Sequence, residues 1–394
     1  MARPGGIEPF TLHYYPNKVK ILTHNIGTLF KLGFAFLGAV MSSGIAIIIH
    51  RRKQLRGVSL RVCFRWVLTG VAAAILGAVP ARAGIVYTCD ASLAADTCAT
   101  LNGTISNLYT SVFSDVNAKI FIQMGSIGVG DLGSNLSVIN TVTSASYKNA
   151  LILDSTSAND ATAVANLPND PLPAPLPNGG VTLTNPLLRA LTGVGAPVNG
   201  YTPGLASCAI NDPGCYDGVI TMGDTIPWWY RSGPEAADAF DFYAVAEHET
   251  DEVLGIGGWG SCVNFSSDCG TAIGPLDLFR FTSNHNRTFS TGTNTPCTAP
   301  SDTNACFSID GGKTLLLSYN NTTSGDTGDY STDCTQVQGY GCPGVGALNV
   351  SPTAELLELD VVGYTQVAPT PEPATLSLLS AGILGLLYAR QRRK

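Results

Sequence analysis

The chain has 394 residues with 22 Lys and Arg against 29 Asp and Glu, and these charges are unevenly distributed. Residues 1–83 hold 11 of the basic residues and a single acid, whereas residues 84–370 hold 7 basic and 27 acidic residues, a net charge of −20. Such a surface repels a phosphate backbone, so we exclude nucleic acid as a partner.

The N-terminal 83 residues have the order of a secretory leader. Basic residues from Arg51 to Arg65 precede an apolar run at residues 66–79, and small residues follow up to Ala83. This pattern predicts a signal peptide with cleavage after Ala83.

A second apolar stretch, residues 32–49, lies upstream and leaves two interpretations open. Either translation begins at Met41 or later, so that residues 1–40 are a mis-called start, or the extension is an unusual leader.

Ten cysteines follow the leader, and they occur as close neighbours along the chain. This spacing predicts five disulfides that close short loops in an oxidising compartment. Metal binding by the thiols is the alternative, but no Cys-x-x-Cys occurs. The expected pairs are Cys89 with Cys98, Cys208 with Cys215, Cys262 with Cys269, Cys297 with Cys306 and Cys334 with Cys342.

Short elements alternate between residues 100 and 222. Hydrophobic periodicity and turn residues predict helices and strands in turn. The glycine-rich segment 125–135 has neither the lysine nor the following helix of a phosphate-binding loop, so we expect a flexible loop there. We expect the strand at 217–222 to be an edge strand along a substrate cleft. The predicted elements are a helix over 105–116, a strand at 118–124, a helix at 144–151, a surface loop at 167–179, a strand at 181–183, a helix at 186–191 and a strand at 217–222.

The segment 242–256 carries the clearest chemical pattern. We expect a helix that begins near Pro234 and ends at Gly255. His248 and Glu252 are four residues apart and therefore share one face of this helix, where both can bind a metal ion. Zinc hydrolases commonly have a second histidine at the position of Glu252, with the intervening glutamate, here Glu249, as general base.

Beyond this helix, Gly, Ser, Thr, Asn and Asp dominate up to residue 350, which predicts loops and short strands pinned by disulfides. A closing helix is expected over 352–362. Aspartates in the glycine-rich loops are either calcium ligands or ordinary turn residues, and their spacing does not match an EF-hand. These aspartates are Asp310, Asp326, Asp329 and Asp333.

The C-terminus has three parts: Pro371-Glu372-Pro373, an apolar stretch at 374–389, and a basic end at 390–394. It resembles the PEP-CTERM sorting signal of bacteria. The resemblance implies export, recognition by an exosortase and the secretion machinery, and transient membrane association until processing releases the protein to the cell envelope or extracellular matrix. A simple C-terminal anchor is the alternative.

Together, these motifs resemble the PEP-CTERM-associated metalloprotease family with a His-Glu-x-x-Glu-Val-Met-Gly type motif. The resemblance covers most of residues 100–364. It implies a secreted, zinc-dependent endopeptidase with an α+β, zincin-like domain over 84–370, between the leader at 1–83 and the sorting segment at 371–394. That domain would combine an active-site helix, a small N-terminal sheet and a loop-rich, disulfide-pinned C-terminal half. The matching stretches are 246–255, 275–281, 307–314, 325–330 and 359–364.

The candidate metal ligands follow from the few histidines present. Residues 84–370 contain only His248 and His285, which excludes a three-histidine site. His248 and Glu252 would bind zinc, and the third ligand would be Asp277, which lies in a family-like stretch, or His285. Glu249 would act as general base toward a peptide substrate.

Two observations weigh against this interpretation. A site with one histidine and two carboxylates is more anionic than a histidine site and suits a harder ion such as calcium or manganese. The acidic residues around His248 could instead be a solvated helix face. The alternative function is a non-catalytic matrix or adhesion protein on a degenerate zincin scaffold.

Overall fold

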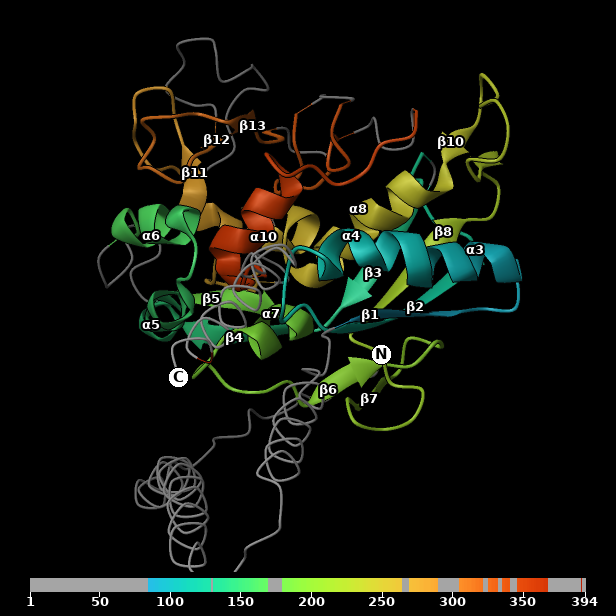
Figure 1. Ribbon diagram of the computed structural model, residues 1–394, viewed down its shortest axis with the longest axis horizontal. Helices are drawn as coiled ribbons and strands as arrows, with labels where there is room; N and C mark the ends of the chain where they lie inside the picture. Colours follow the sequence, from blue (N-terminus) through green and yellow to red (C-terminus); the bar gives the residue numbers. More distant parts are fainter. Residues whose placement is uncertain are drawn as a thin grey trace, which may run out of the picture. The chain divides into compact units, whose positions relative to one another are not determined.

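The computed structural model describes residues 84–128, 130–168, 179–263, 269–289, 305–321, 325–331, 335–340, 346–367 and 391 (Figure 1). The chain falls into two units, residues 1–80 and 81–394, and all described residues belong to the second. Within the described ranges, no helix is long and apolar enough to span a membrane. The apolar stretches at 32–49, 66–79 and 374–389 and most of the proline-rich loop lie outside these ranges.

A four-stranded sheet forms the centre of the N-terminal part, with the strand order β1-β2-β8-β3. The first three strands are parallel, and β3 is antiparallel to β8. Their apolar side chains, such as Ile120 and Ile220, are fully buried. The strands are β1 (Ile85–Cys89), β2 (Ala118–Gly125), β8 (Gly218–Gly223) and β3 (Gly133–Ser137).

The sheet order corrects two predictions. The expected strand at 217–222 is present as β8, but it lies inside the sheet between β2 and β3 rather than at the edge. The edge strand beside β8 is β3, whose first residues, 133–135, belong to the glycine-rich segment predicted to be a loop. This segment is a strand because it pairs with β8, from Gly133 opposite Met222 to Ser137 opposite Gly218. Its own sequence does not predict a strand.

The expected helix at 105–116 is present in a shifted form. A continuous helical segment runs through α3 (Ala95–Thr100), the π-helical turn η2 (Leu101–Ile105) and α4 (Ser106–Thr110). Its buried residues include Leu101, Ile105 and Tyr109.

Three of the other helices lie close to predicted segments, whereas the one at residues 158–165 was not predicted from the sequence. In α5 (Ser144–Asp154), the Thr143 side chain accepts a hydrogen bond from the Ser146 amide and caps the first turn. In α6 (Ala158–Ala165), Ser157 and Asp160 form a capping box. The helices α7 (Asn185–Ala190) and α10 (Glu355–Gly363) confirm the segments expected at 186–191 and 352–362.

Short strands and turns complete a mixed α and β structure with small sheets. The two-stranded pairs are β4 with β5, β6 with β7, and β9 with β10, while β11, β12 and β13 form a three-stranded sheet. These elements are β4 (Ile139–Thr143), β5 (Gly180–Thr184), β6 (Asn199–Tyr201), β7 (Ser207–Ala209), β9 (Trp228–Trp229), β10 (Phe240–Asp241), η3 (Gly257–Gly260), η4 (Pro275–Phe279), β11 (Arg280–Phe281), β12 (Cys306–Phe307) and β13 (Leu317–Ser318).

Three of the five expected disulfides are present, and each closes a loop within one short segment. They join Cys89 to Cys98, Cys208 to Cys215, and Cys262 to Cys269, with Cα atoms 5.9 Å apart in each pair. Cys306 is also disulfide-bonded, but its expected partner Cys297 and the pair Cys334 and Cys342 lie outside the described residues.

The helix that carries the His-Glu-x-x-Glu pattern is α8 (Phe242–Leu254), and it packs against β3 and β8. It begins eight residues after Pro234, because Asp241 caps it by accepting the Tyr243 amide at 3.0 Å and pairs with Arg231 at 2.8 Å. It ends at Gly255 as predicted, where φ is 103° and a side chain would be strained. Every residue of α8 is buried, which excludes the solvated helix face considered from the sequence.

Candidate metal centre

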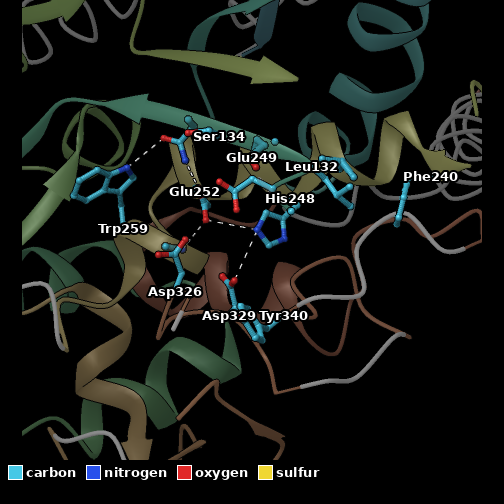
Figure 2. A pocket seen from close by; sticks show the side chains of 17 residues that line it. Leu132, Ser134, Phe240, His248, Glu249, Glu252, Trp259, Asp326, Asp329 and Tyr340 are labelled. Carbon is cyan, nitrogen blue, oxygen red and sulfur yellow. Dashed lines mark hydrogen bonds and ion pairs between the residues drawn. The ribbon is translucent and has the colours of Figure 1, made fainter. Parts of the chain in front are cut away.

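A cleft of about 680 Å³ opens along one side of α8 (Figure 2). His248, Glu249 and Glu252 of α8 line it, and residues 130–135, which lead into and begin β3, face them. Trp259 of η3 lines the cleft beside Asp326, Asp329 and Tyr340 from the loops that precede α10.

Three side chains in this cleft form a group that can hold a metal ion: His248, Glu252 and Asp329. Each offers one ligand atom, and these atoms all lie within 4.8 Å of one another. Nε2 of His248 is 3.6 Å from Oε1 of Glu252 and 3.9 Å from Oδ2 of Asp329. All three residues are buried, since none is more than 8% exposed.

The imidazole of His248 is oriented by the backbone of a distant loop. Nδ1 lies 3.0 Å from the carbonyl oxygen of Val337, which fits an Nδ1–H donor and leaves Nε2 free to bind a metal ion. Burial alone would lower the pKa of His248, but the carboxylates of Asp329, Glu252 and Glu249 outweigh burial and raise this pKa well above its usual value.

Glu252 is held by groups from two other elements. Oε1 accepts a hydrogen bond from the Gly258 amide at 3.1 Å, and Oε2 accepts one from Nδ2 of Asn135 in β3. Oδ1 of Asn135 in turn accepts a hydrogen bond from the Trp259 indole at 3.2 Å. A Cβ atom at Gly258 would lie 2.6 Å from Oε1, so this glycine permits the close approach.

Glu249 faces the same cleft from the preceding turn of α8. Its Oε2 is buried and has no hydrogen-bond partner among the described residues. Burial and the nearby Glu252 carboxylate raise its pKa well above the usual value, which favours a group that takes up and releases a proton. Gly133 of β3 packs so closely that a Cβ there would lie 2.5 Å from Oε1.

The cleft concentrates negative charge without a fixed positive partner. Among its described lining residues none is Lys or Arg, while five are acidic. Oδ1 of Asp329 is buried and has no partner among the described residues, and burial beside Glu252 raises the pKa of Asp326 to about 7. Unpartnered carboxylate oxygens and one imidazole nitrogen are a donor set that fits zinc or a harder divalent ion.

The structure does not bring Asp277, the expected third ligand, into this cluster. Its Oδ1 accepts from Oγ of Ser261 at 2.5 Å, and its Oδ2 accepts from the amides of Cys262 and Gly274 at 2.8 Å. These bonds cap η4 and occupy both carboxylate oxygens, so Asp329 takes the place expected for Asp277.

The remaining candidates also lie outside the cluster. Nδ1 of His285, the alternative third ligand, bonds to the carbonyl oxygen of Gly312. Asp310 bonds to Oγ of Ser308 and the Thr314 amide, both at 2.9 Å, and does not line the cleft with Asp326 and Asp329. The expected calcium set is therefore divided, and Asp333 lies outside the described residues.

Several groups that build the site were missed or misassigned from the sequence. Asp329 was recognised only as a possible calcium ligand, and Gly258 only as a position without a ligand side chain. Asn135 and Gly133 lie in the segment predicted to be a flexible loop. The Asp326-x-x-Asp329 spacing within a family-like stretch was the one available signal.

Comparisons with known proteins identify only the C-terminal end. Residues 369–394 match the PEP-CTERM protein-sorting motif. Neither the curated proteins nor the solved structures contain a match to this chain. The sorting motif confirms the predicted destination: the chain is an exported bacterial protein that an exosortase recognises and processes, and that is anchored at the cell envelope or released outside the cell.

Proposed function

We propose that residues 84–370 form a secreted, metal-dependent endopeptidase with a zincin-like arrangement of helix and sheet. The observation that carries the proposal is the convergence of His248, Glu252 and Asp329 within 4.8 Å, beside a glutamate with an unpartnered buried oxygen. No Lys or Arg among the described lining residues neutralises these carboxylates, which favours a bound cation over an internal ion pair.

Each residue has a role in this proposal. Nε2 of His248 and carboxylate oxygens of Glu252 and Asp329 hold the ion, while the Val337 carbonyl and the Gly258 amide orient the first two. A zinc ion held there would act as a Lewis acid toward a substrate carbonyl. Oε2 of Glu249 takes the proton of the attacking water and passes it to the leaving amine nitrogen.

The structure of the opposite wall of the cleft favours a peptide as the substrate. Strand β3 pairs with β8 on one side and forms the edge of the described sheet. An extended peptide can add to such an edge through main-chain hydrogen bonds, which would place its scissile bond along α8. The packing of α8 against β3 and β8 puts the ligands beside this edge.

The test begins with metal content, measured by plasma mass spectrometry on the exported, oxidised protein after exposure to zinc, manganese and calcium. We expect about one ion per chain, lost in His248→Ala because Nε2 is a ligand. No bound ion in the wild-type protein would contradict the proposal and favour a non-catalytic matrix or adhesion protein.

The catalytic role is tested by Glu249→Gln. This variant should keep the metal ion but lose about 10²- to 10⁴-fold in the rate of hydrolysis of an unstructured protein substrate, because the amide cannot take up a proton. The control is Glu235→Gln, whose parent side chain is exposed, accepts the Gly346 amide and does not line the cleft. Equal activity of the two variants would exclude Glu249 as the base.

A further inference from the structure

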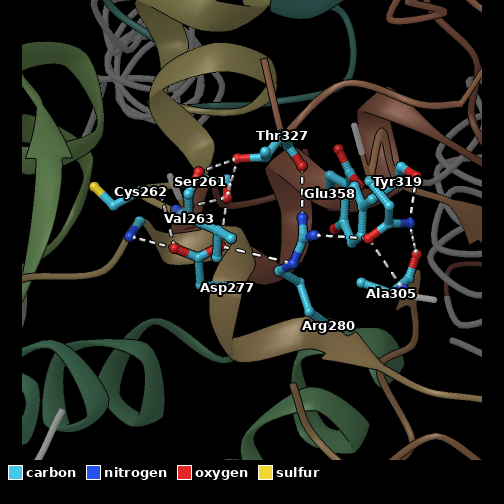
Figure 3. A network of polar contacts seen from close by, with 11 residues as sticks. Ser261, Cys262, Val263, Asp277, Arg280, Ala305, Tyr319, Thr327 and Glu358 are labelled. Atoms are coloured by element: carbon cyan, nitrogen blue, oxygen red, sulfur yellow. Dashed lines mark hydrogen bonds and ion pairs between the residues drawn. The ribbon is translucent and has the colours of Figure 1, made fainter. Parts of the chain in front are cut away.

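The displaced candidate Asp277 is connected through Ser261 to Thr327, which lies in the same loop as Asp329 (Figure 3). Its Oδ1 bonds to Oγ of Ser261 at 2.5 Å, and that hydroxyl lies 3.0 Å from Oγ1 of Thr327. Oγ1 of Thr327 also donates to the carbonyl oxygen of Val263 at 2.7 Å. Ser261, Asp277 and Thr327 are each 1% exposed or less.

A buried arginine holds the same threonine from its other side. Arg280 is fully buried, and its Nη1 donates to the Thr327 carbonyl oxygen at 2.5 Å. Its Nη2 donates to Oδ1 of Asn321 at 3.3 Å, and its guanidinium lies 4.8 Å from the centre of the Tyr319 ring. We call Ser261, Asp277, Arg280 and Thr327 the arginine network.

Thr327 lies in the short loop that supplies two acidic residues to the cleft, Asp326 on its N-terminal side and Asp329 two residues later. Asn320 fixes the ends of this loop, since its backbone amide donates to the Asp329 carbonyl at 2.6 Å and its Nδ2 donates to the Asp326 carbonyl at 2.9 Å. A Cβ at Gly328 would overlap the Gly257 carbonyl, so the loop rests directly on η3.

This loop needs external support because of its charge. Asp329 stands 3.9 Å from the imidazole of His248 and near the carboxylates of Glu252 and Asp326, so opposing charges act on its position when no cation is bound. The hydrogen bond from the Thr327 hydroxyl to the Val263 carbonyl and the one from Arg280 to the Thr327 carbonyl hold the backbone without adding a charge to the cleft.

We propose that the arginine network is a positioning device for the metal centre, in which Thr327 fixes the backbone that presents Asp329 as the third ligand. This inference rests on the proposed function, because it assigns a role at the same metal site. The network would hold the ligands in place before the ion binds. Binding would then not carry the free-energy cost of ordering the loop, so the affinity for the ion is higher.

The direct test compares Thr327→Val with Thr327→Ser. Valine keeps the shape but removes the hydroxyl, whereas serine keeps the hydroxyl. We expect Thr327→Val to weaken Co²⁺ or Zn²⁺ binding about 10- to 100-fold, measured by competition with a chelating dye, and Thr327→Ser to retain near wild-type affinity.

A matched pair of variants separates positioning from stability. Asp217 is a fully buried aspartate that pairs with Arg189 at 2.7 Å and accepts the Lys119 amide at 2.8 Å, and it does not line the cleft. Asp277→Asn and Asp217→Asn should both lower the melting temperature, but only Asp277→Asn should weaken metal binding.

The outcomes distinguish the two proposals. If the wild-type protein binds no ion through His248, the proposed function fails and the positioning role fails with it. If the wild-type protein binds the ion, and Thr327→Val and Asp277→Asn bind it equally well, the positioning role is wrong and the proposed function stands. If Thr327→Val does not fold, Ser261→Ala, which removes the same hydroxyl contact from the other side, replaces it in this comparison.

Discussion

The cleft buries several acidic side chains and the arginine network buries one, Asp277, and their carboxylates have opposite surroundings. In the network, both oxygens of Asp277 accept hydrogen bonds, and Arg280 lies 4.0 Å away. In the cleft, Glu249 and Asp329 each keep a buried oxygen without a partner among the described residues. The comparison teaches that burial of a single carboxylate does not mark a functional group, whereas the convergence of several buried carboxylates on one imidazole does.

The largest expected effect is in the network. Arg280→Met removes a buried cation and leaves Asp277 and the Thr327 carbonyl without it, so we expect a loss of about 3–5 kcal/mol in the free energy of unfolding. Urea denaturation with metal bound and with metal removed would measure this loss.

The matched control is Arg287→Met. Arg287 stacks on the Phe281 ring at 4.5 Å and donates to the Asn166 carbonyl at 2.6 Å, with no carboxylate among these partners. Its loss should cost about 1 kcal/mol. An equal loss in the free energy of unfolding for the two variants would mean that the nearby carboxylate of Asp277 does not make Arg280 more important than Arg287.

The second effect is on catalysis at the opposite wall of the cleft. Gly133→Ala introduces a Cβ about 2.5 Å from Oε1 of Glu249, so the carboxylate must move. We expect hydrolysis to fall about 10- to 100-fold while metal content and melting temperature change little, since only the proton-transferring group is displaced.

Gly103→Ala is the control for Gly133→Ala, because a Cβ at Gly103 meets no atom within 4 Å. It should leave the rate of hydrolysis unchanged. Unchanged hydrolysis in Gly133→Ala would mean that Glu249 works from another position or does not act as the base.

The smallest effect has the opposite sign. Burial beside Glu252 raises the pKa of Asp326 to about 7, so the unfolded side chain loses its proton at a lower pH than the folded one. The contribution of the Asp326 proton to the stability of the metal-free protein is therefore fully present below about pH 4 and is lost as the pH rises through about 7. Asp326→Asn removes this loss and should stabilise the metal-free protein by about 1–2 kcal/mol at pH 8, after allowance for solvent screening.

Thermal unfolding in EDTA at pH 4 and pH 8 measures the effect of Asp326→Asn. The wild-type and variant proteins should have similar stability at pH 4 and differ at pH 8. If the difference in stability between the two proteins were the same at pH 4 and pH 8, the pKa of Asp326 would not be raised in the folded protein.

Sequence patterns predicted the parts of the molecule that depend on near neighbours. The strand at 118–124, the helix at 144–151 and the end of α8 at Gly255 follow from local periodicity or from a single glycine. The predicted start of α8 at Pro234 is wrong. Pro234 and Asp241 are both typical of a helix start, and the pairing of Asp241 with Arg231 favours Asp241.

The parts that sequence could not predict depend on contacts between distant segments. Strand β3 has little strand propensity of its own and is ordered by β8, more than 80 residues later. Asp329 is one of 27 acidic residues in the region, and only the folded loop brings it to His248. The expectation that Asp277 is a ligand depends on a family-like stretch of sequence, and in the fold that stretch forms the hydrogen bonds of η4 instead.

The three local disulfides have a consequence for the order of events during export. Each joins cysteines only 7 or 9 residues apart, so a segment can oxidise as it leaves the membrane without waiting for distant parts of the chain. The central sheet cannot form in this way, because β8 must insert between strands made about 90 residues earlier. We therefore expect the correct disulfides to form before the sheet, with little disulfide rearrangement. The slow step of folding is then the closure of the sheet around β8.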